Sequence, residues 1–144
     1  MRKLLLLLSL LLLLSCSTDV DMPSSLSYPD WLEGTWSGSG ITLEAANGDI
    51  LITIDDYDEE RSVLEELKAW EKKLSSLVIE KTSTTYSITA KTLVYDGDDE
   101  VTTSTAITIT YSSETQVKLT LKGNWPIENS TTVSYSSKTL TKSE

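Results

Sequence analysis

The side chains that could do chemistry in this chain are few. The sequence contains no His and a single cysteine, Cys16. Serine–histidine and cysteine–histidine arrangements are therefore excluded, and with them the commonest machinery of nucleophilic catalysis. The sequence also has no glycine-rich loop of the kind that cradles phosphate groups. We expect a protein that is not an enzyme and that uses no cofactor.

Two groups of carboxylates remain as candidates. The first, at 55–60, comes where a helix is predicted to begin, so capping and the helix dipole explain it better than an acid/base pair does. The second group, which crowds one hairpin turn and could offer oxygen atoms to Ca²⁺, comprises Asp96, Asp98, Asp99 and Glu100. Its spacing does not match an EF-hand loop, and Asp-Gly is a common hairpin turn, so we predict no metal site.

Residues 1–15 have the features of a leader. Met1-Arg2-Lys3 is a short basic end, and an apolar run follows from Leu4 to Leu14, broken only by Ser9. As a helix this run would be about 16 Å long, against a hydrocarbon core of about 30 Å. The run is therefore too short to span a membrane, and its order of parts is that of a signal peptide.

The residues around the cysteine, Leu13-Leu14-Ser15-Cys16, resemble the lipobox of bacterial lipoproteins. That resemblance implies cleavage before Cys16, acylation of its sulfur and of the new amino terminus, and an anchor made of fatty acids such as palmitate. Two or more acyl chains hold a protein stably on a membrane. We expect the protein in the cell envelope, at the outer membrane, on its periplasmic face or at the cell surface. The alternatives are a secretory leader that happens to end in Cys and a chance free thiol.

Charge and composition limit which classes of partner the protein can bind and indicate how the chain is organised. The formal net charge is −10, and loss of the basic leader makes it more negative, which argues against binding to nucleic acid or to anionic lipid surfaces. No second cysteine is present, so we expect no disulfide. A polar stretch with two prolines, 17–29, predicts a flexible tether. We therefore expect a signal peptide at 1–15, a lipidated Cys and tether at 16–29, and one domain at 30–144.

Beyond the tether the pattern is that of β-strands. β-branched residues are dense, and apolar residues alternate with polar ones, as in Tyr86-Ser87-Ile88 and Ile107-Thr108-Ile109. Short turns join these runs, which favours antiparallel neighbours. The predicted strands lie near 34–45, 49–55, 77–82, 85–95, 100–112, 115–123 and 131–142. We predict a mainly β fold, an antiparallel up-and-down β-barrel of about seven or eight strands, because closure removes exposed strand edges.

One segment, from Asp58 to Ser76, departs from the strand pattern. Its apolar residues recur at steps of four, three and four, which is one face of an amphipathic helix: Val63, Leu67, Trp70 and Leu74. Asp56 or Asp58 is expected to cap the start of this helix. The segment comes between the second and third predicted strands, so we expect the helix to close one end of the barrel with its apolar face inward.

A short motif opens the first predicted strand. Gly34-Thr35-Trp36 resembles the Gly-x-Trp signature of lipocalins, and more closely the lipocalin-like, calycin-type domains of small bacterial lipoproteins. The resemblance implies that Trp36 packs in the base of the barrel and that Gly34 allows the tight turn into the strand. Typical lipocalins place an Arg over this tryptophan, but no Arg follows Arg61 here, so Lys138 or Lys142 is expected over the ring.

The same resemblance implies a barrel that binds a small apolar or amphipathic molecule in its interior. The candidate ligand contacts are Trp70, Tyr86, Ile88, Ile107, Ile109, Leu119 and Leu121. One alternative is a protein-interaction or inhibitor module that meets its partner through barrel-end loops, with Tyr28, Trp31 and Trp125 as contacts. Another is a purely structural envelope protein. An apolar cavity of a few hundred Å³ would favour the ligand hypothesis.

Overall fold

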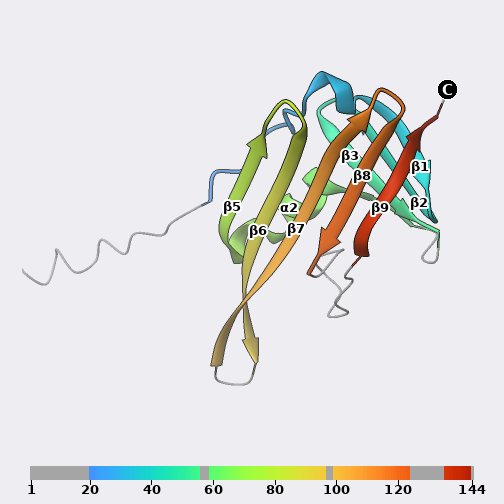
Figure 1. The fold of residues 1–144 in the computed structure, drawn as a ribbon. Coiled ribbons are helices and arrows are strands. Elements are labelled where there is room, and N and C mark those ends of the chain that lie inside the picture. The colour runs from blue at the N-terminus through green and yellow to red at the C-terminus, as the bar shows by residue number, and fades with distance from the viewer. Residues whose placement is uncertain (1–19, 56–58, 97–98, 124–134, 144) are drawn as a thin grey trace, which may run out of the picture.

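The computed structural model describes residues 20–55, 59–96, 99–123 and 135–143 and shows one curled antiparallel sheet (Figure 1). Its nine strands are β1 (Gly34–Gly38), β2 (Ile41–Ala46), β3 (Asp49–Ile54), β4 (Glu59–Ser62), β5 (Leu74–Lys81), β6 (Thr85–Asp96), β7 (Asp99–Ser113), β8 (Gln116–Lys122) and β9 (Tyr135–Lys142). The helical elements are η1 (Asp30–Leu32), α2 (Val63–Trp70) and η2 (Glu71–Lys73). The prediction of a mainly β, antiparallel fold is confirmed.

The sheet forms a half-barrel rather than a closed up-and-down barrel. The strand order is β4-β3-β2-β1-β9-β8-β7-β6-β5, so the first and last strands of the chain pair with each other. Strands β4 and β5 are the two edges, and no strand among the described residues bridges them. The predicted number of strands was too low. One reason is a turn at Ser39 and Gly40, both with positive φ, which divides the predicted strand 34–45 into β1 and β2.

The predicted helix is much shorter than expected and lies at a different place in the strand order. Residues 59–62 form strand β4, because they pair with β3 from Ile54↔Glu59 to Leu51↔Ser62. The helix then begins at Val63, and Ser62 caps it by accepting a hydrogen bond from the Glu65 amide at 2.9 Å. The expected caps, Asp56 and Asp58, lie outside the described residues. The helix therefore follows the fourth strand, not the second.

Helix α2 fills the side of the half-barrel and does not cross its end. The Leu64 amide near its start donates to Asp49 Oδ1 at 3.0 Å, at the beginning of β3. After α2 and η2 the chain enters β5 at Leu74, which pairs with Thr92 far along β6. The helix thus runs along the gap between the two edge strands, behind β6 and β7 in Figure 1. Its inward residues Val63, Leu64 and Leu67 are buried.

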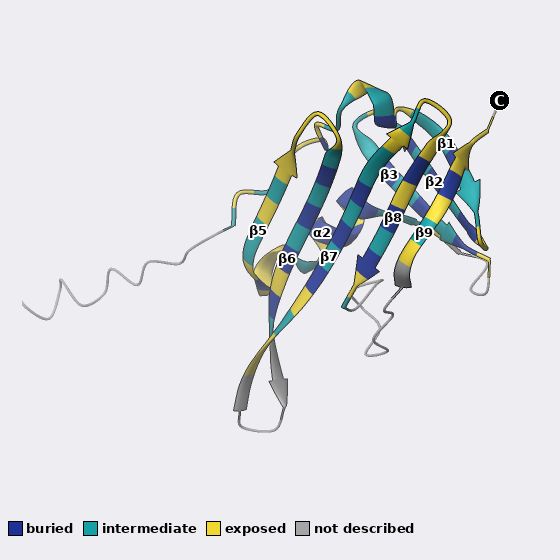
Figure 2. Cartoon of the chain, viewed as in Figure 1, coloured by how far each residue is buried: buried dark blue, intermediate teal, exposed yellow. Residues whose placement is uncertain are grey.

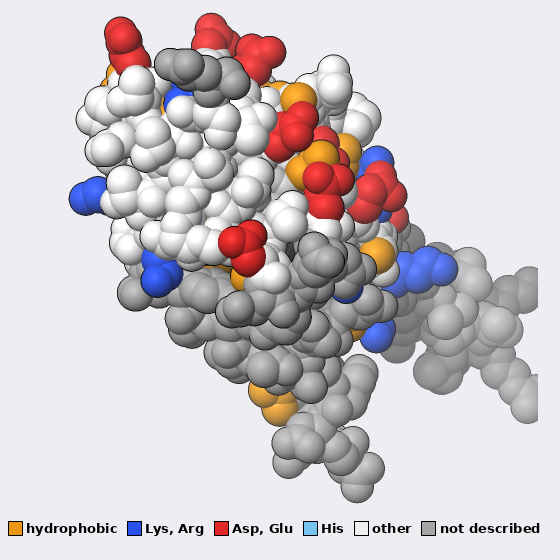
Figure 3. Space-filling view, turned by 90° about the vertical axis from the view of Figure 1, so that its right-hand side faces the viewer, with side chains coloured by type: hydrophobic (Ala, Val, Ile, Leu, Met, Phe, Trp, Pro, Cys, Tyr) orange, Lys and Arg blue, Asp and Glu red, His pale blue; other side chains and the backbone are white. Residues whose placement is uncertain are grey.

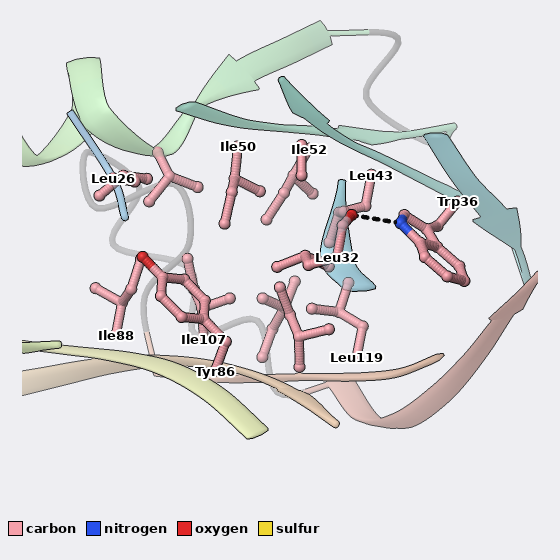
Figure 4. Close-up of a cluster of buried hydrophobic side chains, with 14 of the residues drawn as sticks. Leu26, Leu32, Trp36, Leu43, Ile50, Ile52, Tyr86, Ile88, Ile107 and Leu119 are labelled. Carbon is pink, nitrogen blue, oxygen red and sulfur yellow. Dashed lines mark hydrogen bonds between the residues drawn. The ribbon is translucent and has the colours of Figure 1, made fainter. Parts of the chain in front are cut away.

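The core lies between the two halves of the curled sheet. Buried and exposed positions alternate along the strands, as Figure 2 shows, and the period of two predicted for β3 is confirmed because Ile50, Ile52 and Ile54 are all buried. Side chains of β2 and β3 face those of β6, β7 and β8, and Leu32 from η1 lies between them (Figure 4). The interior is thus built from both halves of the sequence.

Residues 20–29 lie against the domain, whereas we expected them to belong to a free tether. We call this segment the strap. Leu26 is buried in the core, and its amide donates to the Gly48 carbonyl at 2.6 Å. Lys81 Nζ donates to Ser27 Oγ at 3.3 Å, so the strap reaches from the β2–β3 turn to the end of β5. Gly48 has φ +76°, and a Cβ there would lie 2.8 Å from the Cβ of Ser25, so glycine permits the close approach.

The strap and η1 cover one end of the half-barrel, which we call the covered end. The antiparallel register places the turns at 47–48, 82–84 and 114–115 at this end. On the outside of the sheet, at the side of β1, β2 and β9, uncharged polar side chains and backbone cover most of the described surface, and acidic, basic and hydrophobic side chains are scattered over it (Figure 3). Within the described ranges, none of the helices has the length and apolar character needed to span a membrane.

Candidate functional site

The Gly34–Trp36 motif is a packing device at the start of β1. Trp36 is fully buried, and its indole Nε1 donates to the Leu32 carbonyl at 2.8 Å, which ties β1 to η1. Lys142 Nζ lies 5.1 Å from the centroid of the Trp36 ring, within the range of a cation–π contact. Of the two lysines considered for this role, Lys142 therefore fills it. Gly34 has φ +116°, and a Cβ there would lie 3.1 Å from Lys142 Cε.

Six of the seven predicted ligand contacts lie together in the interior. They are Tyr86 and Ile88 on β6, Ile107 and Ile109 on β7, and Leu119 and Leu121 on β8, each at most 2% exposed. Cross-strand pairs such as Tyr86↔Ile109 and Ile109↔Leu119 bring them side by side. They belong to the same buried cluster as the residues of β2 and β3 that face them in Figure 4. The described interior is therefore occupied by the protein's own side chains.

The seventh predicted contact, Trp70, lies at the margin of this interior, where it is half-buried and packs against the core from outside the fully buried cluster. Trp70 is the last residue of α2, is half-buried, and has Lys73 Nζ 4.4 Å from its ring centroid. It lines a surface pocket of about 400 Å³ together with Glu60, Arg61, Ser62, Glu65, Glu66 and Ala69. Trp70 continues the apolar stripe of Val63 and Leu67, but as the last residue of α2 it lies at the end of that stripe.

The surface pocket beside Trp70 is largely polar. Glu66 is a buried carboxylate, and its Oε1 lies 3.1 Å from Nη1 of Arg61. Glu65 pairs with Lys68 at 3.2 Å on the exposed side of the helix. Pairing with the partly exposed Arg61 explains the burial of Glu66, since a buried charge is costly unless it is paired.

The unusual polar group of the interior is the hydroxyl of Tyr86. Tyr86 is fully buried among apolar side chains, and its oxygen has no hydrogen-bond partner in the part of the chain that the structure describes. In Figure 4 the ring extends into the interior with the hydroxyl toward the strap residue Leu26. Burial raises the pKa of this hydroxyl from 10.0 to about 12, and the nearby Tyr28 contributes to the rise. The group is therefore a neutral donor at ordinary pH.

A second buried donor lies near the same end. The indole Nε1 of Trp31, in η1, is buried and also has no hydrogen-bond partner among the described residues. The Trp31 ring lies 5.5 Å from the ring of Tyr111, centroid to centroid, at an angle of 56°. An unpaired buried donor costs about 1–3 kcal/mol, so two of them in one region call for an explanation.

The other candidate residues pack against the core or lie outside the described residues. Tyr28 and Trp31, proposed as contacts of an interaction module, are half-buried against the core, and the Tyr28 hydroxyl accepts a hydrogen bond from the Gly48 amide at 3.4 Å. Trp125 lies outside the described residues, and so does Cys16.

The carboxylates among the described residues form no metal site. Asp55 is exposed at the end of β3, whereas the side chains from Asp96 to Glu100 lie outside those that the structure describes. Across residues 20–55, 59–93 and 101–123 there is no cluster of three or more His, Cys, Asp or Glu that could hold an ion.

The sequence alone led us to predict neither the packed strap nor the unpaired donors. Val20, Met22 and Leu26 are apolar residues within a polar stretch, and they were the available signal that the stretch packs on the domain. Nothing in the sequence marks the Tyr86 hydroxyl, because alternation predicts only that its side chain points inward. Comparisons with protein-family models, with curated proteins and with solved structures gave no match to this chain.

Proposed function

We propose that this protein is a lipid-anchored lipoprotein of the cell envelope whose half-barrel binds a small apolar or amphipathic molecule inside its covered end. The observation that carries the proposal is the Tyr86 hydroxyl, fully buried and without a partner among the described residues. A buried hydroxyl is normally hydrogen-bonded, and a ligand that enters by displacing part of the packed interior would supply the missing partner. The proposal assigns no catalytic step and needs no cofactor.

The proposed anchor and the strap support each other. Residues 17–19 alone separate Cys16 from the first residue of the strap, Val20. Even fully extended, that link spans only about 13 Å. An acylated Cys16 would therefore hold the domain close to the membrane surface, where apolar and amphipathic molecules are concentrated.

Native mass spectrometry of the full chain tests this function. The protein would be purified from bacterial membranes in dodecyl maltoside and then mixed with oleic acid or a total lipid extract. We expect the covalent acyl groups on Cys16 and, in addition, one noncovalently bound molecule per chain. A protein that carries its covalent anchor and takes up no second molecule would contradict the binding proposal while leaving the anchor intact.

A second candidate function, protein interaction, is favoured by the surface pocket beside α2. Its volume of about 400 Å³ and its lining of Trp70 with exposed Glu60 and Glu65 suit a basic side chain of a partner. The two functions are separated by Trp70→Ala, because this change leaves uptake of an interior ligand unaltered. If the chain takes up no ligand but binds a partner that Trp70→Ala releases, the second function is the correct one.

A further inference from the structure

We infer that the ligand carries a hydrogen-bond acceptor at its polar end, held by Tyr86 and Trp31, and that its apolar part takes the place of Leu26. This inference rests on the proposed function and names the chemical class of the ligand. It starts from the two unpaired donors, which the established packing of the core leaves unexplained.

The two donors lie in one region at the covered end. Tyr86 is the second residue of β6 and pairs with Ile109 on β7. Tyr111, two residues beyond Ile109, points to the same face of the sheet, and its ring contacts the ring of Trp31. Diagonal neighbours of this kind lie about 7–8 Å apart. Both donors therefore lie at the covered end, close to the strap.

The chemistry of the donors selects the ligand. An indole N–H donates only, and a tyrosine hydroxyl that stays protonated donates as well. The partner must therefore be an acceptor, such as the carbonyl of an ester, an amide or a carboxylic acid. Because both donors are neutral, they do not compensate the burial of a full negative charge. A neutral carbonyl on an apolar chain, as in a fatty acyl ester, fits best.

The apolar part of such a ligand needs space, and Leu26 is the side chain that can vacate it. Leu26 is buried in the core but comes from the strap, not from a strand. Besides the apolar contacts of Val20, Met22 and Tyr28 with the core, the strap is fastened by isolated hydrogen bonds, from Leu26 to Gly48, from Gly48 to Tyr28 and from Lys81 to Ser27. The interior residues of the strands are held by continuous ladders of hydrogen bonds. Local opening therefore costs least at the strap.

The test compares two long-chain ligands, one with a carbonyl acceptor and one without any acceptor. Full-length protein in dodecyl maltoside would be titrated with methyl oleate or with 1-octadecene, and apparent Kd values would be taken from the rise of the unfolding midpoint. We expect methyl oleate to bind about a hundredfold more tightly, because 1-octadecene lacks both hydrogen bonds and each is worth about tenfold. Tyr86→Phe and Trp31→Phe should each weaken methyl oleate binding about tenfold and leave 1-octadecene unchanged.

Control variants separate binding from folding. Trp70→Phe replaces a half-buried indole that lies outside the proposed ligand site and should leave both Kd values unaltered. Without ligand, Tyr86→Phe should unfold at a temperature no lower than the wild type, because it removes only an unpaired hydroxyl. Leu26→Ala should lower the Kd for methyl oleate, since the ligand no longer displaces the leucine side chain.

The outcomes distinguish the inference from the function on which it rests. If the wild type binds methyl oleate and 1-octadecene equally well, or if Tyr86→Phe and Trp31→Phe bind the ester like the wild type, the inference is wrong and the proposed function stands. If the wild type binds neither probe, the proposed function fails and the inference fails with it. If Leu26→Ala weakens binding, Leu26 does not occupy the ligand's place.

Discussion

Truncation of Trp36 tests whether its buried side chain stabilises the fold by packing β1 against η1. Trp36 is fully buried, so Trp36→Ala should cost about 3–5 kcal/mol of unfolding free energy through lost burial and a residual cavity. The change also leaves the Leu32 carbonyl without the indole donor that lies at 2.8 Å, which adds about 1 kcal/mol. Domains of this size are stable by about 5–15 kcal/mol, so the variant should be close to unfolding.

Urea denaturation followed by circular dichroism measures this loss, and the chain offers a matched control. Trp70→Ala removes the same side chain from a half-buried surface position, where we expect a loss of about 1 kcal/mol or less. Trp36→Phe keeps most of the apolar volume and should fall between the two. A loss below about 1 kcal/mol for Trp36→Ala, or equal losses at the two tryptophans, would refute the role assigned to Trp36.

Three further predictions follow from individual residues. Gly34→Ala should destabilise the protein by about 1–3 kcal/mol, because φ is +116° there, and an unchanged urea midpoint would contradict that argument. The pKa of Tyr86 is about 12 in the folded state and 10.0 in the unfolded state, so the unfolded chain loses the proton first. Its contribution to stability is complete below pH 10 and falls as pH rises from 10 to 12, by at most about 1.4 kcal/mol per unit. Tyr86→Phe should lack this component of the alkaline decline, and parallel declines in the two proteins would contradict it. Cys16→Ala should leave the protein unacylated and outside the normal membrane fraction, whereas normal acylation and fractionation would place the anchor elsewhere.

Local patterns were sufficient to predict the strands and the interior. Alternation along β6, β7 and β8 identified Tyr86, Ile107 and Leu119 as inward-facing, because a period of two is a property of each strand by itself. The turn at Asn47 and Gly48, both with positive φ, was also predictable from residue type.

The remaining features depend on contacts between distant residues. Residues 59–62 continue an acidic, helix-like stretch, but pairing with β3 makes them a strand, and this shortens the helix and leaves Trp70 at its surface end. The strap is polar in sequence and is held by Gly48 and Lys81, which lie far along the chain. Tertiary pairing of this kind overrides local propensity.

The most direct test of an interior ligand is the location of the ligand itself. Full-length protein with labelled methyl groups would be studied in dodecyl maltoside with methyl oleate, and nuclear Overhauser effects between ligand and protein would be measured. We predict contacts from the oleoyl chain to the methyl groups of Ile107 and Leu119, and from the ester methyl group to the ring of Tyr86. Contacts confined to Ala69 and Trp70 on the outer surface would contradict an interior site.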